Sequence, residues 1–313
     1  MARRTPSQLN CLIAVDKPVG CTSHDVVARV RRACHERRVG HAGTLDPLAS
    51  GVMVIGIGQA TRLLGRITQD TKAYIADIVL GSETLTDDAE GEPSRIAPCD
   101  ERHADMAFAH GVLEGFIGTQ MQVPPAYSAI SVGGVRSYKR ARAGEDVELP
   151  AREITVFDAD LLAVSDIEGS PVWTVAFTVS KGTYIRALAR DIGRAADTAA
   201  HVQSLRRTAS GVVSLASCCS TDDLSPDLSD DMLLDPVRIL GVPAIEISES
   251  QCADVLCGRA LPVSLVEHAS GSVDESAAVA ITHGGQLRAL ARHDGSRLAM
   301  TDVFPQGITG VRP

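Results

Sequence analysis

The chain has few aromatic residues, no long apolar run and no cysteine spacing typical of a metal site. Only 3% of its 313 residues are aromatic. None of the eight cysteines forms a C-x-x-C pair, and no histidine lies at zinc-finger spacing from them. The apolar run at residues 12–15 is too short for a signal-peptide core or a membrane span. We therefore expect a cytoplasmic protein with reduced thiols and no membrane association.

Composition otherwise indicates an ordinary globular protein of one large or two smaller domains, with 44% hydrophobic and 22% charged residues. Its net charge of −9 argues mildly against a nucleic-acid partner, but the charge is uneven. Residues 1–44 carry eight basic and three acidic side chains, a net charge of +5, whereas residues 221–235 hold six aspartates and no Lys or Arg. The basic segment keeps nucleic acid among the candidate partners.

One stretch, RVGHAGTLDPLASG at residues 38–51, combines three glycines with a histidine, a threonine and a single carboxylate, Asp46. Glycine allows positive φ and close backbone approach, so such a loop is either a sharp turn or a cradle for a ligand. Asp46 before Pro47 also has the pattern of a helix N-cap followed by proline at the first helical position. Local chemistry alone favours the helix cap.

Apolar patterning predicts both strands and helices. Residues 11–15, 52–57, 72–81 and 173–179 have the pattern of strands. Helices are expected after a capping box at Thr22 and Asp25, from Met106 to near Gly118, and after Thr183 as a cap, with Arg186 off the apolar face of that last helix.

Two Gly-Gly hairpins are also expected. The first spans residues 122–138 around residues 133–134 and is followed by a short basic helix at 139–142. Beyond a domain boundary near Leu240, a capping box at residues 248–251 and a second hairpin around residues 284–285 indicate a small β-rich domain.

The four tyrosines, Tyr74, Tyr127, Tyr138 and Tyr184, lie near basic, glycine-rich or proline-rich turn segments. A single tyrosine in such a place is usually a half-buried core residue. Four on the expected surface of one domain, interleaved with Lys and Arg, make stacking on nucleic-acid bases a hypothesis to weigh.

Several blocks occur in the order of a known family across residues 11–211. They are VDKP at residues 15–18 with Gly20, Thr22 and Ser23; GHAGTLDPLASG at 40–51; KAY at 72–74 with Gly81; QVPPAYSA at 122–129; KGTYIR at 181–186; and LRR at 205–207. On these blocks, and above all on GTLDPLA, the chain resembles the TruB family of bacterial tRNA pseudouridine-55 synthases.

The resemblance implies a pseudouridine synthase fold: an α+β catalytic domain at residues 1–240, with a mixed, mostly antiparallel sheet, flanking helices and an RNA-binding hairpin at about 122–144. It further implies a PUA-like, β-rich RNA-binding domain at 241–313. The implied activity is isomerisation of uridine 55 in the tRNA T-arm stem-loop to pseudouridine, by a monomer, without metal or organic cofactor.

By the same resemblance Asp46 is the essential carboxylate, which can attack the anomeric carbon or stabilise positive charge there. Tyr74 is the ring on which the flipped base stacks, and its hydroxyl is a candidate for proton transfer. Arg186 pairs with Asp46 and keeps it ionised and oriented. The other implied substrate contacts are His41, which fills the gap left by the base, Tyr184 and Leu205 around the uracil, and Lys17, Gly43 and Thr44.

Alternatives stay open for two of these residues, since His41 can be a loop hydrogen-bonding residue and Leu205 plain core. Two positions depart from the family pattern: Leu85 replaces the first aspartate of the T-D-T-x-D-x-x-G loop, and Ser131 stands where lysine is frequent. The sequence leaves open an ester or a glycal intermediate. A non-catalytic tRNA-binding or folding factor is the second hypothesis; a glycosidase-like hydrolase lacks an identifiable second carboxylate.

Overall fold

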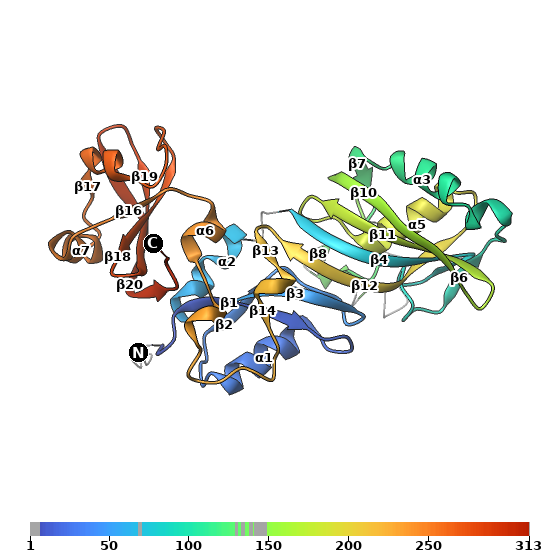
Figure 1. Cartoon of the computed structure of the whole chain (residues 1–313), viewed down its shortest axis with the longest axis horizontal. Coiled ribbons are helices and arrows are strands. Elements are labelled where there is room, and N and C mark those ends of the chain that lie inside the picture. Colours follow the sequence, from blue (N-terminus) through green and yellow to red (C-terminus); the bar gives the residue numbers. More distant parts are fainter. Residues whose placement is uncertain are drawn as a thin grey trace. The chain divides into compact units, whose positions relative to one another are not determined.

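The computed structural model describes residues 7–67, 71–128, 131–132, 135–137, 140 and 149–312 (Figure 1). The chain divides into two compact units. One unit comprises Met1–Asp46, Gly51–Gln69 and Gly211–Pro313, and the other Pro47–Ser50 and Asp70–Ser210. Within the described ranges, no helix is long and apolar enough to span a membrane.

The N-terminal sheet of the first unit is built around its first strand. Its strands are β1 (Cys11–Lys17), β2 (Val39–Ala42), β3 (Ala49–Ile57), β14 (Cys218–Cys219) and β15 (Leu233–Leu234). β1 pairs antiparallel with β3 on one side, and on the other it pairs in parallel with β14 and antiparallel with β15. β2 pairs antiparallel with β3. Every residue of 11–15 and 52–57 is buried, as their unbroken apolar runs predict for interior strands.

Helix α1 (Ser23–Ala33) connects β1 to β2 and starts with the capping box predicted from the sequence. The Thr22 hydroxyl accepts the N–H of Asp25, and the Asp25 carboxylate accepts the N–H of Thr22. The three valines of the predicted stripe are buried. The capping box therefore fixes where the helix begins, and it places Ser23 in the first turn.

A second sheet in the first unit is formed by the C-terminal residues. Its strands are β16 (Ala244–Glu246), β17 (Leu261–Pro262), β18 (Ala278–His283), β19 (Gln286–His293) and β20 (Arg297–Thr309), in the order β16-β18-β19-β20-β17. Helix α7 (Glu249–Leu256) begins at the predicted Ser248–Gln251 capping box and packs against β19 and β20. Gly284 and Gly285 both have positive φ, +60° and +72°, in the predicted hairpin turn.

The two sheets of the first unit share one core. Leu12 and Val54 from the N-terminal sheet pack in the same buried cluster as Leu287, Phe304 and Ile308 from the C-terminal sheet. Polar contacts reinforce the junction, because Asp302 binds the guanidinium groups of Arg62 at 2.6 Å and of Arg66 at 3.1 Å. The predicted separation into domains 1–240 and 241–313 stays a prediction.

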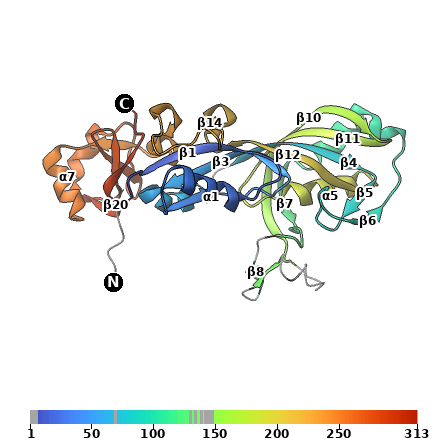
Figure 2. The ribbon, with the colours of Figure 1, turned by 90° about the horizontal axis from the view of Figure 1, so that it is seen from below.

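The second unit contains a five-stranded antiparallel sheet in the order β12-β4-β11-β10-β7. The strands are β4 (Lys72–Leu80), β7 (Gly118–Gln122), β10 (Arg152–Ile167), β11 (Ser170–Val179) and β12 (Ala200–Ser210). Helix α5 (Ile185–Ala195) packs against β12 and β4, and α3 (Met106–Glu114) against β10. Figure 2 shows α5 on one face of this sheet. Ile185, Leu188, Ala189 and Ile192 of α5 are buried, as their spacing predicts.

Two small hairpins and several short elements complete the described chain. β5 (Ser82–Thr84) pairs with β6 (Pro93–Ile96), and β8 (Ser131–Val132) with β9 (Val135–Arg136). The remaining elements are η1 (Gly58–Arg62), α2 (Leu64–Ile67), η2 (Glu101–Ala104), β13 (Val213–Ser214), η3 (Leu215–Ser217), η4 (Asp230–Met232), α6 (Pro236–Leu240) and η5 (Val263–His268).

Some expectations were wrong or fall outside the described residues. Thr183 does not cap α5: its hydroxyl donates to the carbonyl oxygen of Ser180 at 2.9 Å, and Tyr184 occupies the N-cap position without a side-chain cap. The tip of the predicted 122–144 hairpin, residues 133–134, and all of the predicted basic helix 139–142 except Arg140 lie outside the described residues, as does Tyr138.

Candidate active site

The motif that contains Asp46 forms a loop between β2 and β3, and no helix begins at Pro47. The helix-cap interpretation of Asp46 is therefore wrong. Gly43 has a φ of +86°, which explains the glycine at the start of the loop. Leu45, only 4% exposed, is held at both backbone groups by one hydroxyl: its N–H donates to Ser23 Oγ at 2.9 Å and its carbonyl accepts from the same oxygen at 3.0 Å. This clamp fixes the backbone next to half-buried Asp46.

Three more predicted site residues belong to the first unit. Lys17 ends β1 fully buried, and its Nζ donates to the carbonyl oxygen of Pro18 at 2.9 Å. His41 lies on β2, half-buried, with its ring edge-on to that of His24 at 5.9 Å between centroids. Thr44 is exposed. A buried Lys17 and an exposed Thr44 give this segment one fixed and one accessible polar group.

Tyr74 and Leu205 lie on the same face of the second unit's sheet. Tyr74 on β4 is opposite Arg207 of β12, and Leu205 is opposite Ala76, two residues further along β4. Directly paired residues, and residues two apart on a strand, share a face. Tyr74 is 9% exposed and Arg207 1%. The surroundings of Tyr74 in the sequence predicted a surface position, and this prediction is wrong: Tyr74 is part of a largely buried face.

Tyr184 is positioned by its backbone. Its N–H donates to Gln122 Oε1 at 2.9 Å, and its carbonyl accepts from Gln122 Nε2 at 3.1 Å. The amide of Gln122 thus fixes the residue at which α5 begins, two positions before Arg186. Tyr184 is half-buried, and its side chain makes no hydrogen bond that caps α5.

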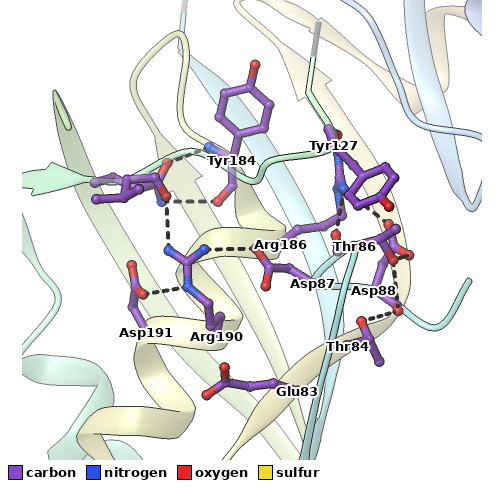
Figure 3. Close-up of polar contacts among 12 residues, drawn as sticks. Glu83, Thr84, Thr86, Asp87, Asp88, Tyr127, Tyr184, Arg186, Arg190 and Asp191 are labelled. Carbon is purple, nitrogen blue, oxygen red and sulfur yellow. Dashed lines mark hydrogen bonds and ion pairs between the residues drawn. The ribbon is translucent and has the colours of Figure 1, made fainter. Parts of the chain in front are cut away.

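Arg186 is buried, 4% exposed, and binds the 84–91 loop and the 122–128 segment (Figure 3). Its Nη1 donates to the carbonyl oxygen of Thr86 at 2.7 Å and lies 3.3 Å from Asp88 Oδ2, while Nη2 donates to the carbonyl oxygen of Tyr127 at 3.2 Å. Asp88 also accepts at Oδ1 from Thr86 Oγ1 at 2.5 Å and from the N–H of Glu90 at 3.1 Å. Asp88 is thus a partner of Arg186 that the sequence alone did not identify.

Two further arginines follow Arg186 at one-turn intervals on α5. Arg190 Nη1 lies 2.9 Å from Asp87 Oδ2, and Arg194 Nη2 lies 2.7 Å from Glu83 Oε2. Burial raises the pKa of Asp87 to about 6, against the opposing effect of Arg190 and Arg186. Burial is also the largest single effect on Glu83 and acts to raise its pKa, but the hydrogen bonds and charges of Arg194 and Arg95 together outweigh it and lower that pKa. In the sequence, the i, i+4, i+8 spacing of the three arginines was the available indication that they lie on one side of the helix and bind a common acidic segment.

The predicted site residues therefore fall into two sets. Tyr74, Leu205, Tyr184 and Arg186 belong to the second unit, whereas Asp46 belongs to the first together with Lys17, His41, Gly43 and Thr44. Pairing of Arg186 with Asp46 stays a prediction. Of the two departures from the family pattern, Leu85 is 54% exposed, and its N–H donates to the carbonyl oxygen of Glu92. The loop keeps its shape through Asp88, without a carboxylate at position 85.

A basic hollow lies at the C-terminal end of α1. It is lined by Arg31, Arg32, His35, Glu36 and Arg37. Glu36 is buried, and its carboxylate accepts from two backbone N–H groups at residues 8 and 9. The Glu36 carboxylate is thereby directed inward, and three exposed arginines line the hollow.

The architecture matches chains of two solved structures. A chain in "Structure of H/ACA RNP bound to a substrate RNA containing 2'-deoxyuridine" superposes with a TM-score of 0.67 at 24% identity, covering 94% of this chain and 84% of that one. A chain in "Crystal Structure of a Cbf5-Nop10-Gar1 Complex" gives 0.65 at 25% identity over the same shares. The class that the fold defines is an α+β protein with a β-rich C-terminal part, as predicted.

Family models narrow this class. The model for the TruB family pseudouridylate synthase N-terminal domain matches residues 31–185, and that for the tRNA pseudouridylate synthase B C-terminal domain matches 186–237. The tRNA pseudouridine synthase B of Paenarthrobacter aurescens (strain TC1) is 43% identical over 305 residues, or 96% of each chain. That of Thermobifida fusca (strain YX) is 45% identical over 257 residues, covering 81% of this chain and 87% of that one. The chain belongs to the TruB family and is a pseudouridine synthase, an isomerase.

Proposed function

We propose that this enzyme converts uridine 55 in the T arm of tRNA to pseudouridine, with Asp46 as the nucleophile toward C1′ of a flipped-out uridine. The observation that carries the proposal is the motif loop, which presents a single carboxylate beside a clamped, buried leucine. The names of the 40–45% identical relatives support tRNA as the substrate. The basic segment around α1 supports an RNA partner in an otherwise acidic protein.

The chemistry needs one carboxylate near the sugar. The N1–C1′ bond breaks, the uracil turns while held, and a C5–C1′ bond forms; the proton on C5 is lost and N1 regains one, so no atom is gained overall. A carboxylate can attack C1′ or stabilise its positive charge, as in retaining glycoside hydrolysis. We assign this role to Asp46, and in this proposal Arg186 pairs with the carboxylate and orients it.

The remaining residues hold the base in this proposal. Extruding a base from its stack costs a few kcal/mol, and stacking on an aromatic ring returns about 1–3 kcal/mol. Tyr74 provides that ring and a hydroxyl for proton transfer. Tyr184 and Leu205 line the uracil pocket, since Leu205 shares the face of Tyr74. His41 fills the gap in the loop, and Lys17, Gly43 and Thr44 contact the RNA around it.

The test uses a T-arm stem-loop carrying tritium at C5 of the target uridine. The full-length enzyme is expected to release the tritium and leave pseudouridine at position 55 and at no other uridine. A stem-loop with cytidine at position 55 is the control and should remain unmodified. Tight binding of the labelled stem-loop without tritium release would favour the non-catalytic binding factor and reject the proposal.

A further inference from the structure

Two arginines one turn apart on α5 bind the same two segments of the second unit. Arg186 donates to the carbonyl oxygens of Thr86 and Tyr127, and Arg190 contacts Asp87 and donates to the carbonyl oxygen of Val123 at 2.9 Å. Each arginine therefore joins the 84–91 loop to the 122–128 segment across the start of the helix, as Figure 3 shows. Arg186 is assigned to the proposed reaction, and Arg190 is not.

All three guanidinium nitrogens of Arg190 contact groups of the protein itself. Its Nε contacts Asp191 Oδ1 at 3.0 Å, Nη1 contacts Asp87 and Nη2 contacts Val123, and its side chain is only 12% exposed. Because the guanidinium is planar and rigid, its three contacts fix Asp191, Asp87 and the Val123 carbonyl relative to one another. Its contacts therefore indicate an internal anchor and not an RNA contact.

Asp87 needs such an anchor. Its φ of +59° lies in the left-handed region, which non-glycine residues enter at a cost. The residue is held there by Arg190 and by backbone bonds to β12, because Val202 donates to the Asp87 carbonyl and Ala89 donates to the Val202 carbonyl. The same turn sets the positions of the Thr86 carbonyl and the Asp88 carboxylate, both of which contact Arg186.

We propose that the Asp87–Arg190 pair is a positioning pair for the isomerisation: it holds the 84–91 loop so that Thr86 and Asp88 keep the Arg186 guanidinium in its working orientation. The inference rests on the proposed function, in which Arg186 orients Asp46. This role requires no contact of Asp87 or Arg190 with the substrate. A largely buried ion pair can serve to fix local geometry instead of adding stability, and we assign this role to Asp87 and Arg190.

The pKa of Asp87 gives the proposal a pH-dependent readout, which a purely structural role of the pair would not produce. Arg190 and Arg186 on α5 lower its pKa, whereas burial, Asp191 on α5 and Glu83 on β5 raise it, with burial the largest effect and a result of about 6. Protonation of Asp87 below pH 6 removes its negative charge from Arg190. The rate of the chemical step is therefore expected to fall on the acid side of pH 6 with the titration of Asp87.

The experiment measures single-turnover pseudouridine formation and RNA binding for Asp87→Asn and Arg190→Gln. Each variant is expected to lose about 10–100-fold in the single-turnover rate with less than a twofold change in Kd, and the double variant should be no slower than either single one because the residues act as one unit. Asp87→Asn should also lose the acid limb of the rate profile. Asp87→Glu should recover part of the rate.

Arg194→Gln is the matched control. Arg194 lies on the same helix and also binds a buried carboxylate, but Glu83 keeps Arg95 as a second partner and belongs to β5. This variant should keep the wild-type rate and its acid limb. An equal loss in Arg194→Gln, a folded Arg190→Gln at the wild-type rate, or fully additive losses in the double variant would overturn the proposal.

Hydrogen exchange separates this inference from the proposed function. The Ala89 amide, bonded to Val202, should exchange faster in Asp87→Asn and Arg190→Gln than in Arg194→Gln, whichever RNA is modified. If the wild-type enzyme forms no pseudouridine in the T arm, the proposed function fails while this exchange pattern still tests the anchor. Unchanged exchange at Ala89 in both variants would reject the anchor itself.

Discussion

The loops around Asp46 and Asp88 are held by different kinds of interaction. The Asp46 loop is fixed by one neutral hydroxyl, Ser23, on the backbone of Leu45. The Asp88 loop is fixed by the buried Arg186 and the half-buried Arg190. Neutral backbone clamps cost little to bury, whereas buried charges cost more than they return unless every partner is present. The first loop should therefore tolerate pH and local changes better than the second.

The largest effect that would follow from this comparison is expected at Arg186. Arg186→Gln leaves the buried Asp88 carboxylate without its cation, which costs about 3–5 kcal/mol of stability, and we expect at least a 100-fold loss in single-turnover rate. The double variant Arg186→Gln/Asp88→Asn removes the unpaired charge, so denaturant unfolding should recover part of the stability while tritium release stays low. If the double variant recovered both its stability and its tritium release, Arg186 would serve only the fold.

Asp87 should make the second loop sensitive to pH. Its pKa of about 6 in the folded protein lies above the ordinary value of 3.8. The group therefore favours folding most below about pH 4, and this contribution is lost as the pH rises through 6. We expect the free energy of unfolding of the wild type, minus that of Asp87→Asn, to be about 2–3 kcal/mol larger at pH 4 than at pH 7.5. A difference that is flat, or that rises with pH, would contradict the effect of burial.

The clamp on the first loop should show a smaller, pH-independent effect. Ser23→Ala leaves a buried N–H and a buried carbonyl of Leu45 unpaired, at a cost of about 1–3 kcal/mol, and we expect roughly a tenfold slower single-turnover rate. Thr22→Ala is the matched control: it removes the cap of α1, worth about 0.5–2 kcal/mol, but no contact to Leu45. Equal rates in the two variants would show that the clamp does not position Asp46.

The smallest effect concerns the basic hollow of the first unit. Six phosphate contacts give a slope of log Kd against log salt of about 4–5 in magnitude, and each contact contributes roughly 0.7–0.9. Arg32→Gln/Arg37→Gln should reduce that slope for tRNA by about 1.5–2 without changing the single-turnover rate at saturation. A control pair of exposed arginines, Arg102→Gln/Arg259→Gln, should leave the slope unchanged. Similar slopes for both pairs would place the RNA elsewhere.

Much of the fold was predictable because its signals are local. The capping boxes at Thr22 and Ser248 and the Gly284–Gly285 hairpin depend on residues within four positions of one another, and all three are confirmed. β2 was not expected, because a strand of the sequence VGHA has glycine and histidine in place of an apolar run. β12 was not expected either, because its two adjacent arginines interrupt the apolar pattern of a strand, although Arg207 is only 1% exposed.

The surroundings of the candidate site were predictable only in part. The motifs predict Asp46, Tyr74 and Arg186 as site residues, and this stays a prediction. They do not predict the contact between Arg186 and Asp88, which lies almost a hundred residues away along the chain. Pattern analysis within a helix cannot show a partner supplied by a distant loop. The helix cap predicted at Asp46 and Pro47 was wrong because the local pattern did not show that a strand, β3, follows instead of a helix.

The most direct measurement is single-turnover tritium release from a C5-labelled T-arm stem-loop by the wild type and Asp46→Asn at equal RNA occupancy. If Asp46 is the nucleophile, the variant should bind the stem-loop within a few-fold of the wild-type Kd and release no tritium above background. Release by Asp46→Asn at a rate near that of the wild type would contradict the assignment.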